Sequence, residues 1–234
     1  MAEIVKKMKK NDESASKKVN SFLTNYRGIV ITLACVLVIG AVVLCLALAL
    51  GEKNTEKNLS KLDSIEYDLI RKVDDKVVTD AEVIHSRQTM ALENLKEFKN
   101  KRGVVGTRAK MLEAEIYFMQ EDYAAARDAW TLAANASKGA YTASRCNYNA
   151  AVSAELAGDK ERAVLLFEAS AKAKDNYNAA HAYFSAGRVN ESLECYNAAL
   201  KDYKKVTDDY STSSWAGLAN DRIIYIKANG LVTE

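Results

Sequence analysis

The chain has 234 residues, enough for one ordinary domain with appendages, and it contains no proline. A proline-free chain rich in Ala, Leu, Lys and Glu is typical of an all-helical protein. The net charge of +2 is unevenly spread, because residues 1–27 carry +4 and residues 51–234 carry −2, so no broad basic surface is left for binding nucleic acid.

The first predicted element is a transmembrane helix at residues 28–50. These 23 residues carry no charge and are nearly all Val, Ile, Leu, Ala or Cys. As a helix they would be roughly 35 Å long, which is enough to cross a hydrocarbon layer of ~30 Å. A buried core helix rarely runs this long without a polar face, so the pattern favours a membrane anchor.

Cleavage of this segment is the main alternative. The Ala-Leu-Ala tripeptide at residues 47–49 is similar to a signal-peptidase site, but the 27-residue leader and the long apolar stretch exceed those of a secretory signal. Lipoprotein processing at Cys35 or Cys45 would need different residues before each cysteine. We therefore expect a retained signal anchor at residues 28–50, preceded by a basic cytoplasmic tail at residues 1–27.

The basic residues on the two sides of the apolar segment predict its orientation. Those on the N-terminal side include Lys9, Lys10, Lys17, Lys18 and Arg27, whereas those just after it are Lys53, Lys57 and Lys61. The positive-inside rule favours a cytoplasmic N-terminus and an exported domain. The exported part has two cysteines, Cys146 and Cys195, and the sequence leaves open whether they pair.

The segment at residues 51–80 is predicted to be helical. One face of this helix is apolar and consists of Leu59, Leu62, Ile65, Leu69 and Val73. One interpretation is a stalk or docking helix that precedes a domain at residues 81–234. The other is the first helix of a hairpin that packs onto residues 81–101, and the sequence leaves both open.

The region from residue 81 to residue 234 contains internal repeats. Three segments combine small residues in a first helix, a turn, and a second helix with small-x3-aromatic-x2-small spacing. The sets are Ala114, Tyr117, Asp122, Tyr123, Ala126, Trp130 and Ala133; Ala151, Gly158, Asp159, Ala163, Phe167 and Ser170; and Ala180, Tyr183, Gly187, Arg188, Ser192, Tyr196 and Ala199. Small residues allow close helix crossings, and the aromatic fills the space between hairpins. The pattern resembles tetratricopeptide (TPR) repeats and predicts an all-α solenoid of about three full repeats.

Incomplete units are predicted on both sides of these repeats. A helix with Asp80 as its N-cap has the second-helix spacing at Ala91, Leu95 and Phe98. At the other end, residues 211–214 can cap a last helix that stops at residues 229–230, Asn-Gly. Terminal repeats that cap a solenoid are expected to be atypical.

The first helix of each hairpin should line a concave face. In the register above, each of these helices directs a base inward and follows it with long apolar or aromatic residues. The candidate groove residues are Arg108, Met111, Phe118, Arg145, Tyr148, Lys174, Tyr177 and Phe184, and the same count places Glu115, Val152, Glu155 and His181 on this face. Such a groove would hold a peptide with apolar anchors and an acidic group. Alternatively, the bases are solvated and the aromatics fill the stack.

Catalytic and metal-binding patterns are absent from the sequence. Its two histidines, His85 and His181, are far apart, and no cysteine or carboxylate cluster has metal-ligand spacing. Gly158 and Gly187 are isolated rather than part of a phosphate-binding loop. We therefore expect no enzyme activity, no cofactor, no metal and no small-molecule substrate, and we expect partners that are other proteins.

The order of elements resembles that of the YfgM-like ancillary subunits of the bacterial SecYEG translocon. Residues 209–219, Asp-Tyr-Ser-Thr-Ser-Ser-Trp-Ala-Gly-Leu-Ala, are similar to a Tyr-Pro-x-Ser-x-x-Ala-x-x-Ala hairpin of YfgM-like and BamD-like domains, with Ser211 in place of proline. The resemblance implies a bacterial inner-membrane protein with a periplasmic domain, and partners such as the translocon, a chaperone or a secreted client. It leaves open an accessory of translocation or envelope chaperoning, or a scaffold subunit of a fixed envelope complex.

Overall fold

The structure is a computed structural model that describes residues 20–22, 24–72, 77–173 and 176–232. Over these ranges the regular secondary structure is helical and includes no strand. The chain divides into two compact units, Met1–Lys57 and Asn58–Glu234. The predicted all-helical class is confirmed.

The first unit contains the N-terminal part of helix α2 (Arg27–Ile70). The most apolar 18-residue stretch of this helix has a mean hydropathy of 3.2, and the described side chains of that stretch are not buried inside the protein. By length and composition α2 can therefore cross a membrane, and the predicted segment 28–50 lies within it. Most of the predicted cytoplasmic tail, residues 1–19 and 23, lies outside the described residues.

The second unit begins with the last turns of α2, which form a hairpin with α3 (Ala81–Leu95). Leu62 and Ile65 of α2 are buried in one apolar cluster with Leu95 at the end of α3 and Phe98 just beyond it. The carboxylate of Asp80 caps α3 as predicted, accepting a hydrogen bond from the Glu82 backbone N–H at 2.9 Å. The end of α2 therefore packs onto α3 as a hairpin helix, which is the second of the two interpretations of this segment, and does not form a separate stalk. Val73, the last residue of the predicted apolar face, lies outside the described residues.

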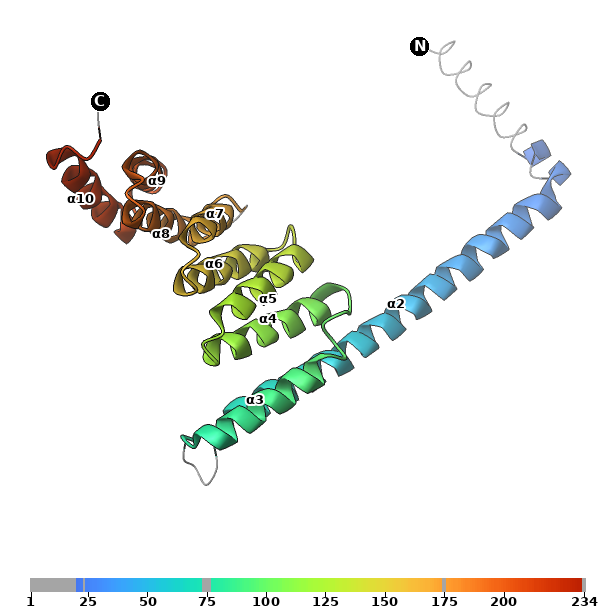
Figure 1. Ribbon diagram of the computed structural model, residues 1–234. Coiled ribbons are helices and arrows are strands. Elements are labelled where there is room, and N and C mark those ends of the chain that lie inside the picture. The colour runs from blue at the N-terminus through green and yellow to red at the C-terminus, as the bar shows by residue number, and fades with distance from the viewer. Residues whose placement is uncertain (1–19, 23, 73–76, 174–175, 233–234) are drawn as a thin grey trace, which may run out of the picture. The chain divides into compact units, whose positions relative to one another are not determined.

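The remaining helices follow one another as antiparallel pairs (Figure 1). The pairs are α4 (Gly103–Met119) with α5 (Tyr123–Ala136), α6 (Tyr141–Leu156) with α7 (Lys160–Ala171), and α8 (Ala179–Ser192) with α9 (Tyr196–Asp209). The last helix, α10 (Ser214–Ala228), packs against α9 and α8. It begins after the N-cap Ser213 and ends at residues 229–230, as predicted.

Each of these pairs is joined by the same kind of turn. One residue adopts a left-handed backbone conformation, with φ of 61° at Glu121, 84° at Gly158 and 59° at Glu194. The next residue is the N-cap of the second helix, and in the first two pairs it is an aspartate, which accepts a hydrogen bond from a backbone N–H of the first helical turn. These turns set the start of every second helix, and therefore the register of the repeats.

The predicted register of the third repeat is wrong. Gly187, expected in the turn, lies inside α8, and the turn is at Glu194 instead. The aromatic residue that fills the core from α9, the second helix of the third repeat, is therefore Tyr203 and not Tyr196. Tyr203 is fully buried. The corrected spacing from Trp130 to Phe167 is 37 residues and from Phe167 to Tyr203 is 36 residues, so the repeats are nearly regular.

The close contact between Gly187 and the ring of Tyr203 determines this register. A Cβ atom at this position would lie 2.7 Å from Cε1 of Tyr203, which is closer than side chains tolerate. The equivalent residues of the two preceding repeats are alanines, Ala114 and Ala151, both fully buried. A small residue at this point of the first helix therefore leaves room for the aromatic of the second helix in the third repeat.

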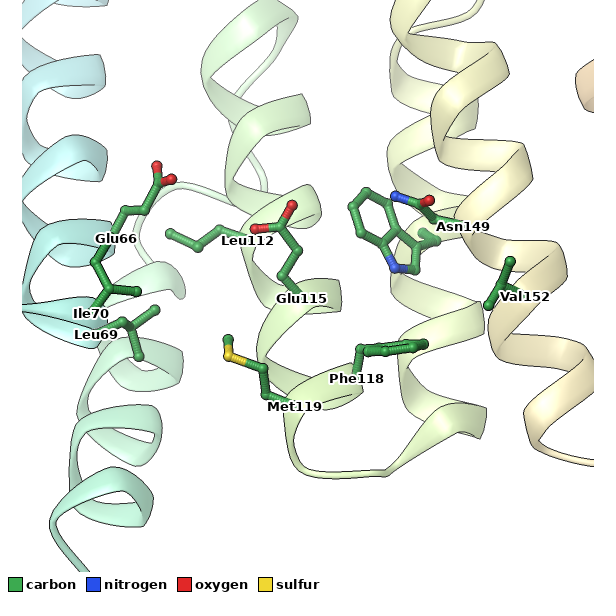
Figure 2. Close-up of a pocket in the computed structure, with 10 residues that line it drawn as sticks. Glu66, Leu69, Ile70, Leu112, Glu115, Phe118, Met119, Asn149 and Val152 are labelled. Carbon is green, nitrogen blue, oxygen red and sulfur yellow. The ribbon is translucent and has the colours of Figure 1, made fainter. Parts of the chain in front are cut away.

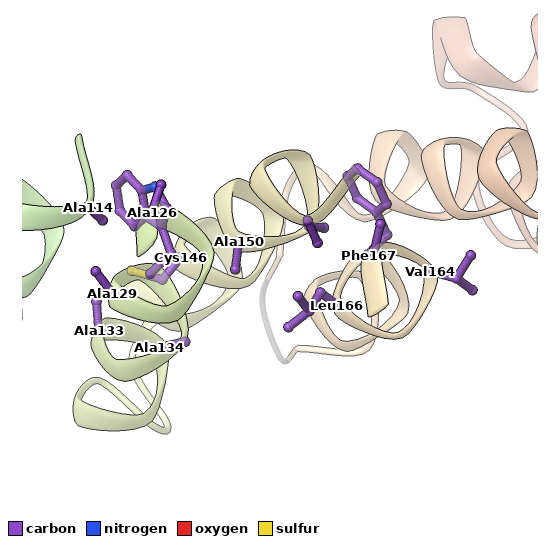
Figure 3. Close-up of a cluster of buried hydrophobic side chains, with 14 of the residues drawn as sticks. Ala114, Ala126, Ala129, Ala133, Ala134, Cys146, Ala150, Val164, Leu166 and Phe167 are labelled. Carbon is purple, nitrogen blue, oxygen red and sulfur yellow. The ribbon is translucent and has the colours of Figure 1, made fainter. Parts of the chain in front are cut away.

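Alanine-rich packing forms the core between the repeats (Figure 3). Trp130 and Phe167, expected to fill the space between hairpins, are both buried. They are surrounded by small side chains, including Ala126, Ala129, Ala133, Cys146 and Ala150. Since small side chains let helix axes approach closely, the core between the repeats combines a few large residues with many small ones.

Candidate functional site: a groove between the first helices

An open groove lies within the second unit, between the C-terminal end of α2, α4 and α6 (Figure 2). Its volume is about 410 Å³, within the usual range for ligand-binding clefts. The side chains that line it are mostly apolar and come chiefly from the first helix of each hairpin. They are Glu66, Leu69, Ile70, Leu112, Glu115, Phe118, Met119, Trp130, Asn149 and Val152.

Helical spacing explains why these residues share one surface. On α4 the lining positions 115, 118 and 119 follow position 112 by three, six and seven residues, which places all four on one face over two turns. Ile70, Met119 and Phe118 remain 71%, 51% and 37% exposed, although all three are large and apolar. The groove is thus an apolar surface that the repeat stack leaves uncovered.

The polar groups of the groove are predominantly acidic. Glu66 and Glu115 contribute carboxylates, and Asn149 contributes an amide. Figure 2 shows the two carboxylates toward one end of the groove, and Phe118 and Met119 toward the other. An acidic end and an apolar end therefore lie along the same surface.

Arg108, a predicted groove base, is neutralised by the end of α2. Its guanidinium lies 2.6 Å from Oδ1 of Asp63 and 2.9 Å from Oε2 of Glu66. These two ion pairs join α4 to α2 and raise the pKa of Arg108 against the opposing effect of burial. The base expected to receive an acidic group from a ligand is therefore already paired with two carboxylates.

Glu115 lacks such a partner among the described residues, where no ion pair or hydrogen bond reaches its carboxylate. Burial raises the pKa of Glu115 above its usual value, and the nearby Glu66 carboxylate raises it further. Arg145 and Arg108 act in the opposite direction through longer-range attraction. Glu115 is thus a partly desolvated carboxylate facing an open groove.

Of the other predicted groove residues, Phe118 lines this groove, and Met111 and Tyr148 do not. Met111 packs against the main core cluster. Tyr148 makes an edge contact with Phe167, with ring centroids 5.1 Å apart, and its hydroxyl lies 2.9 Å from Nε2 of His181. Tyr148 thus belongs largely to the packing between repeats.

The inner face of α8 is also filled by aromatic packing. His181 stacks on Trp215 of α10, with ring centroids 3.9 Å apart and planes 7° from parallel. Phe184, another predicted groove residue, lies 5.1 Å from the Trp215 ring, centroid to centroid. Burial lowers the pKa of His181, and the positive charge of Arg188 lowers it further. Toward α8 and α10, the aromatics therefore fill the stack.

The remaining predicted residues do not form a shared inner wall. Tyr177 is 92% exposed and precedes α8 instead of lying on it, because the third repeat starts later than expected. Arg145 is exposed on α6, and Lys174 lies outside the described residues. The structural equivalent of Tyr148 in the third repeat is Phe184, 36 residues further along the chain.

The sequence prediction missed the contribution of α2 to the groove. Glu66 and Ile70 line it together with Leu69, which was assigned to the apolar face of a possible stalk helix. The sequence contained a signal for this contribution. The apolar face of residues 59–69 has the pattern of a first helix, and it belongs to the hairpin that precedes the first recognised repeat. Met119 and Asn149 were also missed, since they lie next to the positions counted as inward.

The cysteines and the acidic side chains suggest no other chemical site in the described part of the chain. No group of three or more His, Cys, Asp or Glu side chains there is placed to hold a metal ion. Cys146 is buried, and burial raises the pKa of its thiol to about 11. Cys195 is exposed, and the two cysteines are not paired with each other.

Comparison with known proteins supports the repeat architecture. No family model matches the chain. A TPR repeat-containing protein of Treponema pallidum (strain Nichols) is 27% identical to it over 176 residues, which cover 70% of this chain and 74% of that protein. The chain is similar to a TPR protein. Since TPR arrays present extended concave surfaces for binding, the similarity favours a protein-interaction module with other proteins as partners.

Proposed function

We propose that this chain is a membrane-anchored TPR module that binds polypeptide segments in the groove between α2, α4 and α6. The observation that carries the proposal is the uncovered apolar groove, in which Ile70 and Met119 are more than half exposed and Phe118 is more than one-third exposed, beside two carboxylates. Monomeric surfaces rarely expose large apolar side chains together unless they bind something. The first helices of helical repeats are suited to this role, because they present a continuous inner surface.

The proposed cellular setting is the periplasmic side of a bacterial inner membrane. The long apolar part of α2 would act as a retained signal anchor, and the excess of basic residues before it would keep the N-terminus in the cytoplasm. A groove in an exported domain that is tethered to the membrane would suit an accessory of protein translocation or envelope chaperoning. Its partners would be the translocon, a periplasmic chaperone or a secreted client.

Site-specific photo-crosslinking in intact cells tests this function. A photo-crosslinking amino acid at position 119, in the groove, should capture polypeptides. The matched control is position 132, where Leu132 is 54% exposed on α5, the second helix of the same hairpin. The additional change Phe118→Ala should remove the products from position 119, since loss of an apolar anchor typically costs more than about 1 kcal/mol of binding. Equal products from positions 119 and 132, or none from 119, would contradict the proposal.

A second candidate function is that of a scaffold subunit in a fixed envelope complex, and the exposed face of α10 favours it. Leu218, Ile224 and Tyr225 are large apolar side chains left exposed on this helix. Large apolar side chains exposed together on one helix are typical of a surface that another protein covers. A scaffold would co-purify with one partner at fixed stoichiometry after detergent extraction, and Leu218→Lys would release that partner. A groove that handles transient clients would instead yield many substoichiometric partners that Leu218→Lys leaves bound.

A further inference from the structure

The charge of the groove indicates what kind of polypeptide it can accept. Of its two carboxylates, Glu66 is held in an ion pair by Arg108, whereas Glu115 forms no ion pair within the described part of the chain. Removing a carboxylate from water without a partner is costly. Any occupant that covers the groove would desolvate Glu115 further, so occupants that bring a positive charge are favoured over neutral or acidic ones.

Three charged neighbours change the electrostatic field around Glu115, but none of them supplies it with a direct ion-pair partner. Glu66 strengthens the negative field around Glu115, while Arg108 and Arg145 weaken it. Arg108 is already committed to Asp63 and Glu66, and Arg145 is exposed to solvent on α6. Neither arginine therefore replaces the direct partner that an incoming Lys or Arg would supply.

The apolar half of the groove sets how far the apolar side chain of a bound peptide would lie from the charge that meets Glu115. Phe118 and Met119 follow Glu115 by three and four residues on α4, which corresponds to about 4.5–6 Å along the helix axis. In an extended peptide, side chains on one face repeat every two residues, or about 6.6–6.8 Å. In a helical peptide, the matching spacing is three or four residues.

Resting on the proposed function, we propose that the groove selects polypeptide segments in which a Lys or Arg stands about one helical turn from a large apolar side chain, with Glu115 receiving the cation. The apolar side chain would contact Phe118, Met119 and Ile70, which are the exposed apolar residues of the groove. Segments with acidic residues at the same place are rejected, because they meet two carboxylates. This reverses the charge preference expected from the sequence.

The alternative occupants fit the groove less well. Acidic peptide tails and anionic lipid headgroups would both be repelled by Glu66 and Glu115. A second copy of the chain would have to present a basic and apolar segment of its own. The open groove spans helices from three successive hairpins, which matches the length of a short peptide segment better than that of a compact ligand.

Peptide binding to the full chain in nanodiscs of neutral lipid tests the selectivity. The probes are fluorescent Ala/Gln-based peptides with one Leu and one Arg four residues apart, in either order, and matched peptides with Glu in place of Arg. We expect the Arg peptide to bind at least about tenfold more tightly than the Glu peptide. The substitution Glu115→Gln should reduce this ratio to about threefold or less while keeping the shape of the side chain. Glu161→Gln, an exposed acid of α7, is the matched control and should leave the ratio unchanged.

The outcomes separate the inference from the function on which it rests. If both peptides bind with equal affinity, and Phe118→Ala weakens both, the charge selectivity is wrong and the groove function stands. If neither peptide binds and position 119 captures nothing in cells, both proposals fail. An equally large ratio in the Glu115→Gln chain would also overturn the assignment, because another group would then receive the cation.

Discussion

Replacing Gly187 by alanine should destabilise the repeat domain, although alanine is the better helix former. The added Cβ would lie 2.7 Å from Cε1 and 2.8 Å from Cδ1 of Tyr203. The tyrosine ring has little room to move, because it is fully buried, packs against Phe184 and donates a hydrogen bond from its hydroxyl to Glu191 at 2.9 Å. Overpacking of this kind costs about 1–3 kcal/mol, against a gain of about 1 kcal/mol in helix propensity. The net loss should be up to about 2 kcal/mol.

Gly217 provides the matched control for this substitution. It also lies within a helix, but a Cβ at this position would have no heavy atom within 4 Å. Gly217→Ala should therefore stabilise the domain by about 0.5–1 kcal/mol, so the two glycines should respond with opposite signs. Urea unfolding of the full chain in detergent, followed by far-ultraviolet circular dichroism, measures both changes. A Gly187→Ala chain as stable as the Gly217→Ala chain would refute the register that pairs Gly187 with Tyr203.

Three further predictions concern a buried acid, the turns and the topology. Burial raises the pKa of Asp202 to about 6, so the folded state disfavours its charged form, and stability is lost as pH rises from about 4 to 7. Asp202→Asn should recover at most about 3 kcal/mol at pH 7.5 and little at pH 4, measured by urea unfolding at each pH; equal gains at both would contradict the burial argument. Gly158→Ala should cost about 1 kcal/mol and Glu194→Gly should stabilise by about 0.5–1 kcal/mol, because both positions have positive φ; thermal melts check both, and equal signs would refute the turn argument. Protease added to spheroplasts should digest the chain beyond residue 50 and spare an N-terminal tag, and protection of the C-terminal domain would refute the orientation.

Features with local causes were predictable from the sequence. The apolar segment 28–50 is defined by composition alone. The caps at Asp80 and Ser213 follow from short side chains that can accept hydrogen bonds from nearby backbone N–H groups. Trp130 and Phe167 are buried as expected, because each follows a turn whose residues set the start of its helix. In all these cases the deciding interactions lie within a few residues along the chain.

The register of the third repeat required the tertiary structure. Between residues 190 and 205 the small-x3-aromatic spacing fits both Ser192 with Tyr196 and Ala199 with Tyr203, so this spacing does not choose between the two tyrosines. The choice depends on the fit between Gly187 and Tyr203, which lie on different helices. A seven-residue shift of register preserves the apolar face of a helix, because seven residues are nearly two full turns.

The charge of the groove also depends on contacts between helices that only the tertiary structure shows. The sequence shows that Arg108 is basic, but whether it is available to a ligand depends on the acids that the fold brings beside it. Those acids, Asp63 and Glu66, precede it by more than 40 residues and belong to a different helix. Once they pair with Arg108, Glu115 is the carboxylate left facing the groove. The sequence therefore determined that the protein has an inner face of first helices, while packing between helices decided which charge that face presents.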